Sequence, residues 1–495
     1  MSNQVKGVSY KKMDKSYFES RELKRHAGVW SLWALGVGAV ISGHFSGWNL
    51  GLASGGWGGM FIATIIIAIM YIGLTQSVAE MSPALPHTGG AYSFARSAMG
   101  PWGGFFTGLV ENMEFVLTPA VIVFFISSYM SGIFDTGPDS LPYWWFGFYT
   151  FFTILNIVGV ELSFRLTVVV TILALLCLVV FWISSIGNID FFANALNIKV
   201  GASGKAELLS GGNGDFLPMG IVGALGAMPF AVWLFLAIEQ LPLAAEESVD
   251  PKKDMPKGLT YGMITLIISA FMILWLNSSI PLGAYALSQS GEPLLDGFKE
   301  LFGSNIAKGL TLVAVIGLIA SFHTIIFAFG RQIYSLSRAG YFPVFLSVTH
   351  SKRKTPYMAL IAGSVIGFAV LMLTRFLSGA EESGVFIGGA LLNMAVFSAM
   401  LSYVLQCASF LLLRVKRPEL ERPYVSPMGK GGAWLTIFIA MVTIYFQLQD
   451  SSYRVAVFSA IAYLIVGLLY FAIQGRHRLI LSPEEEFAMN KKPND

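Results

Sequence analysis

Two acidic residues, Glu111 and Glu114, stand inside the apolar run 102–133, which holds no other charged residue. A carboxylate at membrane depth costs a few kcal/mol or more, so it normally faces a cavity or a transport path rather than lipid. Positions 111, 114 and 118 share one helix face, because residues three and four apart are neighbours there. We therefore predict that Glu111, Glu114 and Thr118 form one polar stripe directed at a functional cavity.

Three roles are open to this pair of acids. Glu114 can act as the counter-ion of a cationic substrate while Glu111 lies on the exit path. One of them can instead carry a proton, as carboxyl groups inside pumps and transporters do. Both can also serve structure alone, by accepting hydrogen bonds from broken backbone. We take Glu114 as the substrate-binding candidate and Glu111 as the candidate for a proton or a gate.

The composition requires a membrane around these helices. Of the 495 residues, 55% are hydrophobic and only 12% are charged. A helix needs about 20 apolar residues to cross the hydrocarbon core. We predict an all-α polytopic membrane protein with twelve transmembrane helices, near residues 29–53, 58–79, 102–133, 141–159, 164–187, 216–240, 258–279, 306–337, 355–376, 384–414, 432–449 and 452–474.

Basic residues indicate the orientation. They are concentrated before the first helix and in alternate loops, as the positive-inside rule describes for cytoplasmic segments. We expect a multi-pass protein of the plasma membrane whose tails, 1–28 and 475–495, are both cytoplasmic. The net charge of +3 follows from these loops and calls for no nucleic-acid partner. No phosphate loop, dinucleotide fingerprint or metal-spaced Cys/His cluster occurs, so we expect no cofactor, no metal and no ATP-driven pump.

Glycines interrupt two of the predicted helices. Helix 1 contains the runs 36–38 and 42–44, and helix 6 contains Gly223, Gly226 and Pro229. Interrupted helices at matching positions of two halves indicate the binding site of a secondary transporter, although glycines also permit close helix packing. We therefore predict an inverted repeat. Its parts are a first five-helix unit 29–187, an outer loop 188–215, a second five-helix unit 216–414, and peripheral helices 11 and 12 within 415–474.

Four stretches of the chain resemble the amino acid, polyamine and organocation transporter superfamily, and the likeness extends over essentially the full length. They are residues 36–41 in helix 1, 80–92 in an inner loop, 245–257 after helix 6, and 331–343 after helix 8. The resemblance implies a leucine-transporter-like fold. In that fold five plus five inverted helices, with helices 1 and 6 broken, give alternating access to a central site.

Within the superfamily the chain most resembles the ethanolamine permease family, through the runs 111–115, 118–121 and 235–239. Amino acid carriers of the superfamily usually have Gly-Ser-Gly or Gly-Ala-Gly at the helix 1 break, where backbone amides hold the substrate carboxylate. Here the run is Ser42-Gly43-His44. Its two Cβ atoms restrict the positive φ values that such an anion nest needs. We therefore predict a substrate without a carboxylate.

Several other residues are candidates for substrate contact. Glu239 lies beyond the expected helix 6 break and can accept from substrate or support the helix end. Trp233 and Phe235 can offer π faces to an ammonium, or they can pack. His44 can bond a substrate hydroxyl or titrate near neutral pH, or be a satisfied core residue. The predicted substrate site is Ser42, Gly43, His44, Glu114, Trp233, Phe235, Ile238 and Glu239.

The coupling ion stays open between H⁺ and Na⁺. Sodium-dependent members of the fold place helix 8 hydroxyls against helix 1 carbonyls, and Ser321 and Thr324 fall at suitable places for a possible ion site. Some proton-coupled relatives carry a lysine on helix 5 at that position. Here the matching residue is Ala174, which argues against that mechanism.

The resemblance and the acids together predict a secondary active transporter, not an enzyme. It would import a small organic amine, ethanolamine first, as a monomer or a homodimer. The alternative is an amino acid or polyamine permease or exchanger, and a channel or membrane enzyme is the alternative from another class. Charged residues near inner helix ends can form gates or act as topology signals; they are Glu80, Arg96, Arg165, Glu246, Glu247 and Arg331.

Overall fold

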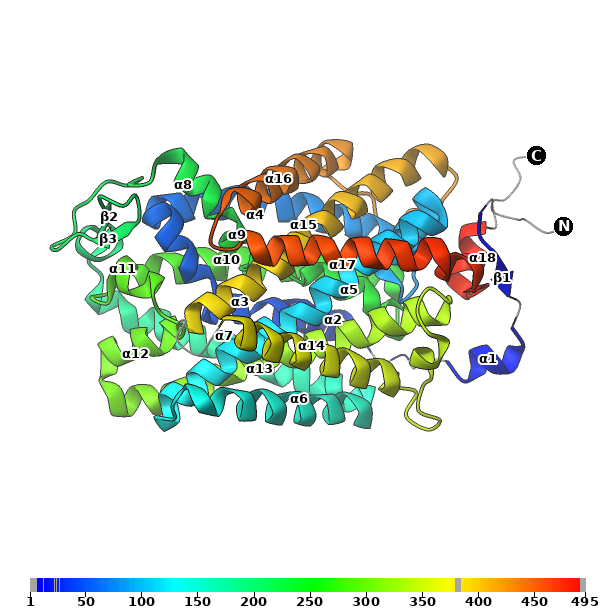
Figure 1. The fold of residues 1–495 in the computed structure, drawn as a ribbon, viewed down its shortest axis with the longest axis horizontal. Helices are drawn as coiled ribbons and strands as arrows, with labels where there is room; N and C mark the ends of the chain where they lie inside the picture. Colours follow the sequence, from blue (N-terminus) through cyan, green and yellow to red (C-terminus); the bar gives the residue numbers. More distant parts are fainter. Residues whose placement is uncertain are drawn as a thin grey trace.

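The long helices run roughly side by side along one axis (Figure 1). The first and last described elements, β1 (Tyr10–Lys11), α1 (Lys15–Glu19) and α18 (Pro483–Met489), gather at one end, which we call the terminal end. A hairpin of β2 (Ile198–Val200) and β3 (Ala206–Leu208) marks the opposite, distal end. This computed structural model describes residues 7–11, 13–21, 23, 25, 27–378 and 384–489.

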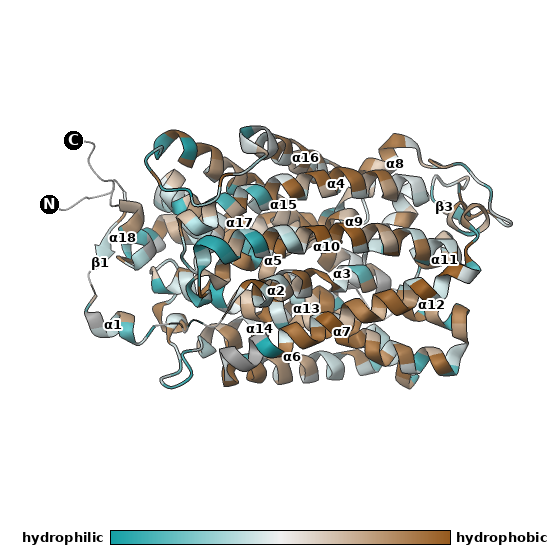
Figure 2. Cartoon of the chain, turned by 180° about the vertical axis from the view of Figure 1, so that it is seen from behind, coloured by the Kyte–Doolittle hydropathy of each residue, from teal (hydrophilic) through white to brown (hydrophobic). Residues whose placement is uncertain are grey.

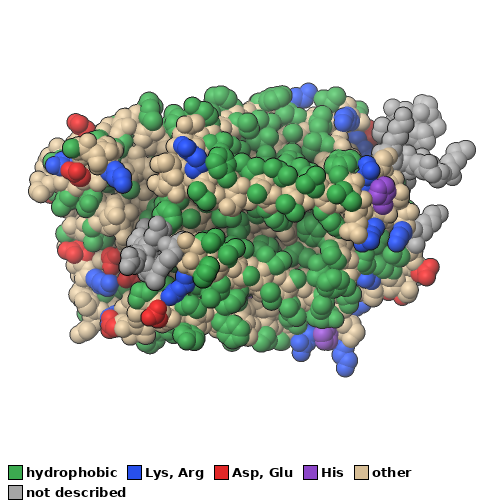
Figure 3. Space-filling model, in the orientation of Figure 1, with side chains coloured by type: hydrophobic (Ala, Val, Ile, Leu, Met, Phe, Trp, Pro, Cys, Tyr) green, Lys and Arg blue, Asp and Glu red, His purple; other side chains and the backbone are tan. Residues whose placement is uncertain are grey.

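Nine helices within the described residues are long and apolar enough to cross a membrane. Apolar side chains cover the flank of the bundle, and charged side chains gather toward its two ends (Figures 2 and 3). This is the distribution of a protein embedded in a bilayer. The prediction of an all-α multi-pass membrane protein is confirmed, while the count of twelve and the five-plus-five repeat stay predictions. The nine helices are α4 (Gly51–Ala84), α5 (Gly90–Phe134), α7 (Val160–Ser185), α10 (Pro251–Ser279), α13 (Ser304–Arg338), α14 (Tyr357–Ser378), α15 (Gly384–Lys416), α16 (Gly429–Gln449) and α17 (Arg454–Ile473).

Shorter elements connect and cap these helices. The α-helices among them are α2 (Val29–Val40), α3 (Ser42–Phe45), α6 (Leu141–Val158), α8 (Gly220–Gly226), α9 (Met228–Val232), α11 (Gly283–Ser288) and α12 (Pro293–Phe302). One π-helical turn is η4 (Phe191–Ala195). The 3₁₀ helices are η1 (Trp48–Leu50), η2 (Pro138–Ser140), η3 (Ile186–Asn188), η5 (Ile238–Glu247), η6 (Val344–Ser347) and η7 (Gly475–His477). The last strand, β4 (Leu479–Ile480), pairs in parallel with β1.

The chain leaves helical geometry at both places where glycines interrupt the predicted helices. α2 ends at Val40, and after the single turn of α3 the backbone of Ser46 is extended. α9 ends at Val232, and residues 233–237 form turns before η5 begins. Unwinding a helix inside a bundle frees backbone donors and acceptors there, which is tolerated only where protein or a cavity receives them.

Two predicted helices are parts of longer elements. The predicted helix 58–79 lies in α4 and the predicted helix 102–133 lies in α5. Each element turns sharply at a glycine with positive φ, 66° at Gly56 and 82° at Gly100. Glycine adopts these angles without the steric cost that a Cβ imposes. The predicted outer loop 188–215 contains the β2–β3 hairpin, which the sequence pattern did not indicate.

One buried carboxylate fastens the two chain ends to the bundle. Glu485 of α18 is fully buried and accepts hydrogen bonds from Tyr10, Tyr92 and Tyr341 at 2.7–2.9 Å. The Arg96 guanidinium forms an ion pair with the same carboxylate. These donors come from β1, from the start of α5 and from the segment after α13. The predicted gate residue Arg96 thus holds the C-terminal segment in place.

Replacing Glu485 with glutamine is expected to lower the free energy of unfolding by about 3–5 kcal/mol, because Arg96 would keep a buried charge without its counter-ion. Chemical unfolding in detergent micelles measures this change. Glu486→Gln is the matched control, since Glu486 is exposed on the same helix and should shift stability by no more than about 0.5 kcal/mol. Equal effects of the two variants would contradict the anchoring role.

Candidate functional site

Three acids meet in the middle of the bundle. Glu111 and Glu114 come from α5 and Glu239 from the first turn of η5, and none of them is more than 2% exposed. The carboxyl groups of Glu114 and Glu239 lie within hydrogen-bond reach of one another, and Glu111 interacts electrostatically with both. Two ionised carboxyl groups cannot bond to one another, because both only accept. Both side-chain oxygens of Glu114 and of Glu239, and one of Glu111, have no hydrogen-bond partner. We call these three residues the acid cluster.

The cluster differs from the predicted stripe in one member. Thr118 is buried, but its hydroxyl donates to the carbonyl of Glu114 one turn earlier, at 2.7 Å. Glu239 takes the place that the stripe gave to Thr118. The contact between α5 and η5 brings Glu239 beside the two acids. Helix periodicity relates only residues of one helix, so it could not predict this contact.

Two tyrosines that the sequence analysis did not single out complete the cluster. Tyr71 of α4 and Tyr403 of α15 are fully buried, and their hydroxyl oxygens lie 2.9 Å apart. Tyr403 faces the carboxyl groups of Glu114 and Glu239. The only sequence signal for this pair was the presence of a hydroxyl in each of two apolar helices, which is too common a feature to select them.

The helix 6 break positions Glu239 beside these tyrosines. Ala237, just before η5, has a φ of 84°, a left-handed conformation that few residues other than glycine adopt. Phe235 lies in the same break, with its ring centroid 5.5 Å from that of Tyr71. Two of the predicted site residues, Phe235 and Glu239, thus join Glu114 around Tyr71 and Tyr403.

Ala237→Gly is expected to stabilise the protein by about 0.5–1 kcal/mol. The left-handed conformation costs an L-residue roughly 1–2 kcal/mol, of which the greater chain entropy of glycine offsets a part. Ala231→Gly is the control, because Ala231 is buried in helical α9, where glycine should cost about 1 kcal/mol. Thermal unfolding in detergent measures both, and destabilisation by Ala237→Gly would show that the break is not strained there.

The two helix breaks contact one another at Gly43. A Cβ on Gly43 would lie 2.1 Å from the carbonyl oxygen of Trp233, so only glycine allows this approach. The Trp233 indole nitrogen donates to the carbonyl of Ser46 at 3.0 Å. Gly43 and Trp233 therefore join the breaks of helices 1 and 6, with the indole directed at helix 1 backbone rather than left open for a ligand.

His44 and Ile238, one from each break, both contact α10. His44 is fully buried, and its Nε2 lies 3.3 Å from the Ser269 hydroxyl of α10. Ile238 packs close to Gly36 of α2 and Gly262 of α10. The structure thus places His44 and Ile238 against α10, and their predicted contact with substrate stays a prediction.

The predicted ion-site hydroxyls are engaged by the protein. Ser321 donates to the carbonyl of Gly38 at 2.6 Å and accepts from the Ser42 amide at 2.8 Å, so it ties α13 across the helix 1 break. Thr324 donates to two carbonyls of its own helix at 3.0 Å. On α7, one turn before Ala174, the Thr171 hydroxyl donates to the carbonyl of Ala34 in α2 at 3.1 Å. No group of three potential metal ligands occurs among the described residues.

This arrangement of two touching helix breaks around buried acids can be compared with known proteins. A sequence profile of the family described as "Amino acid permease" matches residues 32–480. The chain belongs to the amino acid permease family. It is a membrane transporter and not an enzyme, and the predicted membership of the wider superfamily is confirmed.

Curated relatives match this permease along most of its length. An uncharacterized transporter of Rhizobium meliloti is 27% identical, over 91% of this chain and 92% of its own. The branched-chain amino acid permease BcaP of Bacillus subtilis is 25% identical, over 92% and 94%. The methylthioribose transporter of Bacillus subtilis is 23% identical, over 93% and 96%. Transporters whose names specify different substrates thus match this chain at similar levels of sequence identity.

Two ion pairs close the terminal end of the permease beneath the acid cluster. Arg331 of α13 bonds Glu247 of η5 at 2.7 Å, and both side chains are at most 1% exposed. Arg338 bonds Glu246 at 2.7 Å with both guanidinium NH groups directed at that carboxylate. Burial alone would raise the pKa of Glu246, but Arg338 outweighs it and lowers that pKa to about 2. The pair is therefore ionised at neutral pH and joins α13 to the end of helix 6.

Glu80, another of the predicted gate residues, also has an arginine partner. It bonds Arg414 of α15 and receives the amide of Ser426 at 2.8 Å. This contact fastens α4 to α15 at the terminal end, and it lies apart from the segment that carries Glu246 and Glu247.

Hydrogen bonds close the distal end of the permease. Tyr129 of α5 donates to the carbonyl of Phe45 at 2.7 Å, and its oxygen accepts from the Leu294 amide of α12 at 3.2 Å. The Asn49 amide donates to the carbonyls of Leu287 and Ser290 at 2.7 and 2.8 Å. Contacts at both ends of the bundle thus separate the buried acids from solvent.

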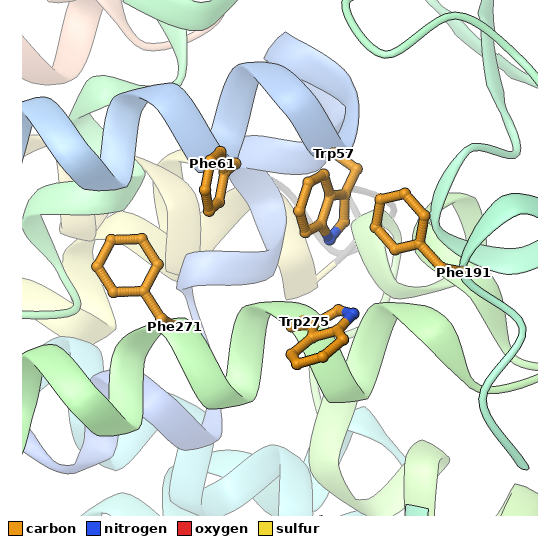
Figure 4. A pocket seen from close by; sticks show the side chains of 5 residues that line it. All are labelled: Trp57, Phe61, Phe191, Phe271 and Trp275. Carbon is orange, nitrogen blue, oxygen red and sulfur yellow. The ribbon is translucent and has the colours of Figure 1, made fainter. Parts of the chain in front are cut away.

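A separate pocket of about 380 Å³ lies between α4, η4 and α10 (Figure 4). Its lining is aromatic throughout: Trp57, Phe61, Phe191, Phe271 and Trp275. None of the predicted site residues lines it, and Trp275 is half exposed on the flank of the bundle. The polar chemistry of the permease therefore resides in the acid cluster rather than in this pocket.

Proposed function

We propose that this permease imports a small organic amine by alternating access, with ethanolamine as the leading candidate. The observation that carries the proposal is the acid cluster. Within the described residues, none of its three acids forms an ion pair with a lysine or arginine. Several buried carboxyl oxygens also lack any hydrogen-bond partner. A bound ammonium would supply both the missing positive charge and three N–H donors.

The helix 1 break supports a substrate without a carboxylate. Ser42 offers its amide to Ser321 rather than to the interior. Gly43 is covered by the Trp233 carbonyl, whose partial negative charge would repel an anion. The backbone that would hold a carboxylate is thus already occupied by the protein.

Proton coupling is the better supported of the two ionic mechanisms. Glu114 and Glu239 lie close enough for one proton to bridge their carboxyl groups. By contrast, the Ser321 oxygen already accepts the Ser42 amide, and the Gly38 carbonyl already accepts the Ser321 hydroxyl. We propose that the ammonium displaces the bridging proton to Glu111, so that one proton and one ammonium occupy the acid cluster together. The residues Ser42, Gly43, Trp233 and Ser321 would then act by holding the two breaks together.

The terminal end is proposed to face the cytoplasm of a cell bounded by the plasma membrane. Basic side chains gather there (Figure 3), including those at positions 352–354, which are exposed or half-exposed. The positive-inside rule assigns such loops to the cytoplasm. Import then requires the pairs Arg331–Glu247 and Arg338–Glu246 to open.

An amino acid is the second candidate substrate, because relatives of the permease are named for amino acids, including the L-asparagine permease of Salmonella typhimurium. Uptake into proteoliposomes separates the two candidates. We expect ethanolamine to be taken up saturably, faster under an imposed proton gradient than under a sodium gradient, and to be inhibited by other small amines. Inhibition by branched-chain amino acids or asparagine as strong as that by ethanolamine would refute the amine proposal.

A further inference from the structure

Tyr71 and Tyr403 form a pair of phenols beside the acid cluster. Both rings are buried, and they come from two helices that contact one another, α4 and α15. Their centroids are 5.4 Å apart at an interplanar angle of 72°, an edge-to-face contact that brings the two hydroxyls together. Phe235 of the helix 6 break packs against Tyr71 on one side. The pair therefore forms a fixed wall of the cluster.

The two phenols retain hydrogen-bonding capacity beyond their mutual contact. Each phenol has one O–H donor and an oxygen that also accepts. The contact between Tyr71 and Tyr403 uses one donor and one acceptor, so one donor and one accepting oxygen remain for a third group. The neighbouring carboxyl groups of Glu114 and Glu239 offer acceptors only when ionised. The ionised acids of the site thus only accept hydrogen bonds, whereas the phenols can both donate and accept them.

Ethanolamine carries two groups that match this division. Its ammonium has donors only, whereas its hydroxyl has one donor and accepts as well. An acid next to an ammonium forms a charge-assisted hydrogen bond, which is stronger than one between neutral groups. The ammonium therefore belongs with Glu114 and Glu239, and the hydroxyl belongs with the phenols.

We propose that Tyr403, supported by Tyr71, binds the substrate hydroxyl and makes the permease select amino alcohols over plain amines of the same length. This inference rests on the proposed function. A plain amine would place a methyl group against the phenols, so the accepting phenol oxygen would stay buried without a donor and the remaining O–H could bond only to the acids. Sites built to bond a hydroxyl reject analogues that lack it for this reason.

The test compares ethanolamine with ethylamine as inhibitors of labelled ethanolamine uptake into proteoliposomes. For the unmodified permease we expect half-inhibition to need roughly tenfold more ethylamine than ethanolamine. Tyr403→Phe should reduce this ratio to about one while leaving inhibition by ethylamine nearly unchanged. A purely structural role of Tyr403 would weaken both inhibitors equally, so an unchanged ratio overturns the inference.

Tyr149→Phe is the matched control, because Tyr149 of α6 is also a buried phenol whose oxygen has no partner, and it should keep the ratio of the unmodified permease. If Tyr403→Phe does not fold, Tyr71→Phe decides. It leaves the Tyr403 hydroxyl without its fixed neighbour and should lower the ratio, and no change would overturn the inference. Failure of the proposed function is distinguishable, since the unmodified permease would then take up no ethanolamine.

Discussion

Glu114→Gln is expected to weaken inhibition by small amines by at least roughly tenfold and by up to about a hundredfold. A hydrogen bond to a charged group contributes about 1.5–3 kcal/mol, and the neutral amide cannot replace the charge that faces the ammonium. Competition against labelled substrate, at several pH values between 6 and 8, roughly the range in which proteins are most stable, measures the change. Unchanged affinity at all of them would exclude Glu114 as the counter-ion.

Glu111→Gln is the matched comparison for this experiment. Glu111 is as deeply buried on the same helix, but it lies beside Gln332 of α13 rather than beside Tyr403. Amine affinity should then change by less than about threefold, while the dependence of uptake rate on an imposed proton gradient should weaken. Equal loss of affinity in both variants would mean that the two acids bind substrate together.

The sequence allowed the location of the acid cluster to be predicted because charge in an apolar helix has few physical explanations. Glu111 and Glu114 cannot face lipid, and the glycines of helices 1 and 6 mark where a helix can unwind. Glu239 was found by its place after the second break. These three inferences used one helix at a time, and the structure places all three residues together.

The companions of the cluster could not be predicted, because they depend on which helices pack together. Tyr403 acquires its surroundings only through the contact of α15 with α4 and α5, and its partner Tyr71 is 332 positions away in the sequence. The neighbour of His44 could not be predicted either, because the rotation of α3 decides that its Nε2 lies beside Ser269. A single turn of helix has no sequence pattern that fixes its rotation.

The terminal end illustrates the same limit. The segment 475–495 was expected to be a cytoplasmic tail, and nothing in its sequence indicated contacts with the bundle. In the structure, Glu485 is buried and contacts three tyrosines and Arg96. Arg96 and Glu485 are 389 positions apart, so their buried ion pair forms only when the helices of the bundle have packed together.

Arg331→Met is expected to lower the free energy of unfolding by about 3–5 kcal/mol, because it leaves the Glu247 carboxylate buried without its counter-ion. The Arg331–Glu247 pair is buried from solvent, and the Arg331 guanidinium carbon lies 3.9 Å from the centre of the Phe327 ring. Unfolding in detergent micelles measures the loss. Combining Arg331→Met with Glu247→Leu should restore most of the stability, since a hydrophobic pair of similar volume removes the uncompensated charge.

The exposed pair Lys252–Glu421 provides the control for this prediction. Its side chains are 55% and 78% exposed, so Glu421→Gln should cost no more than about 1 kcal/mol. The double variant at positions 331 and 247 also tests the gate. If the pair must separate in every transport cycle, replacing it with a hydrophobic contact should alter the uptake rate while amine affinity stays constant. A double variant with normal stability and normal rate would reduce the pair to a structural contact.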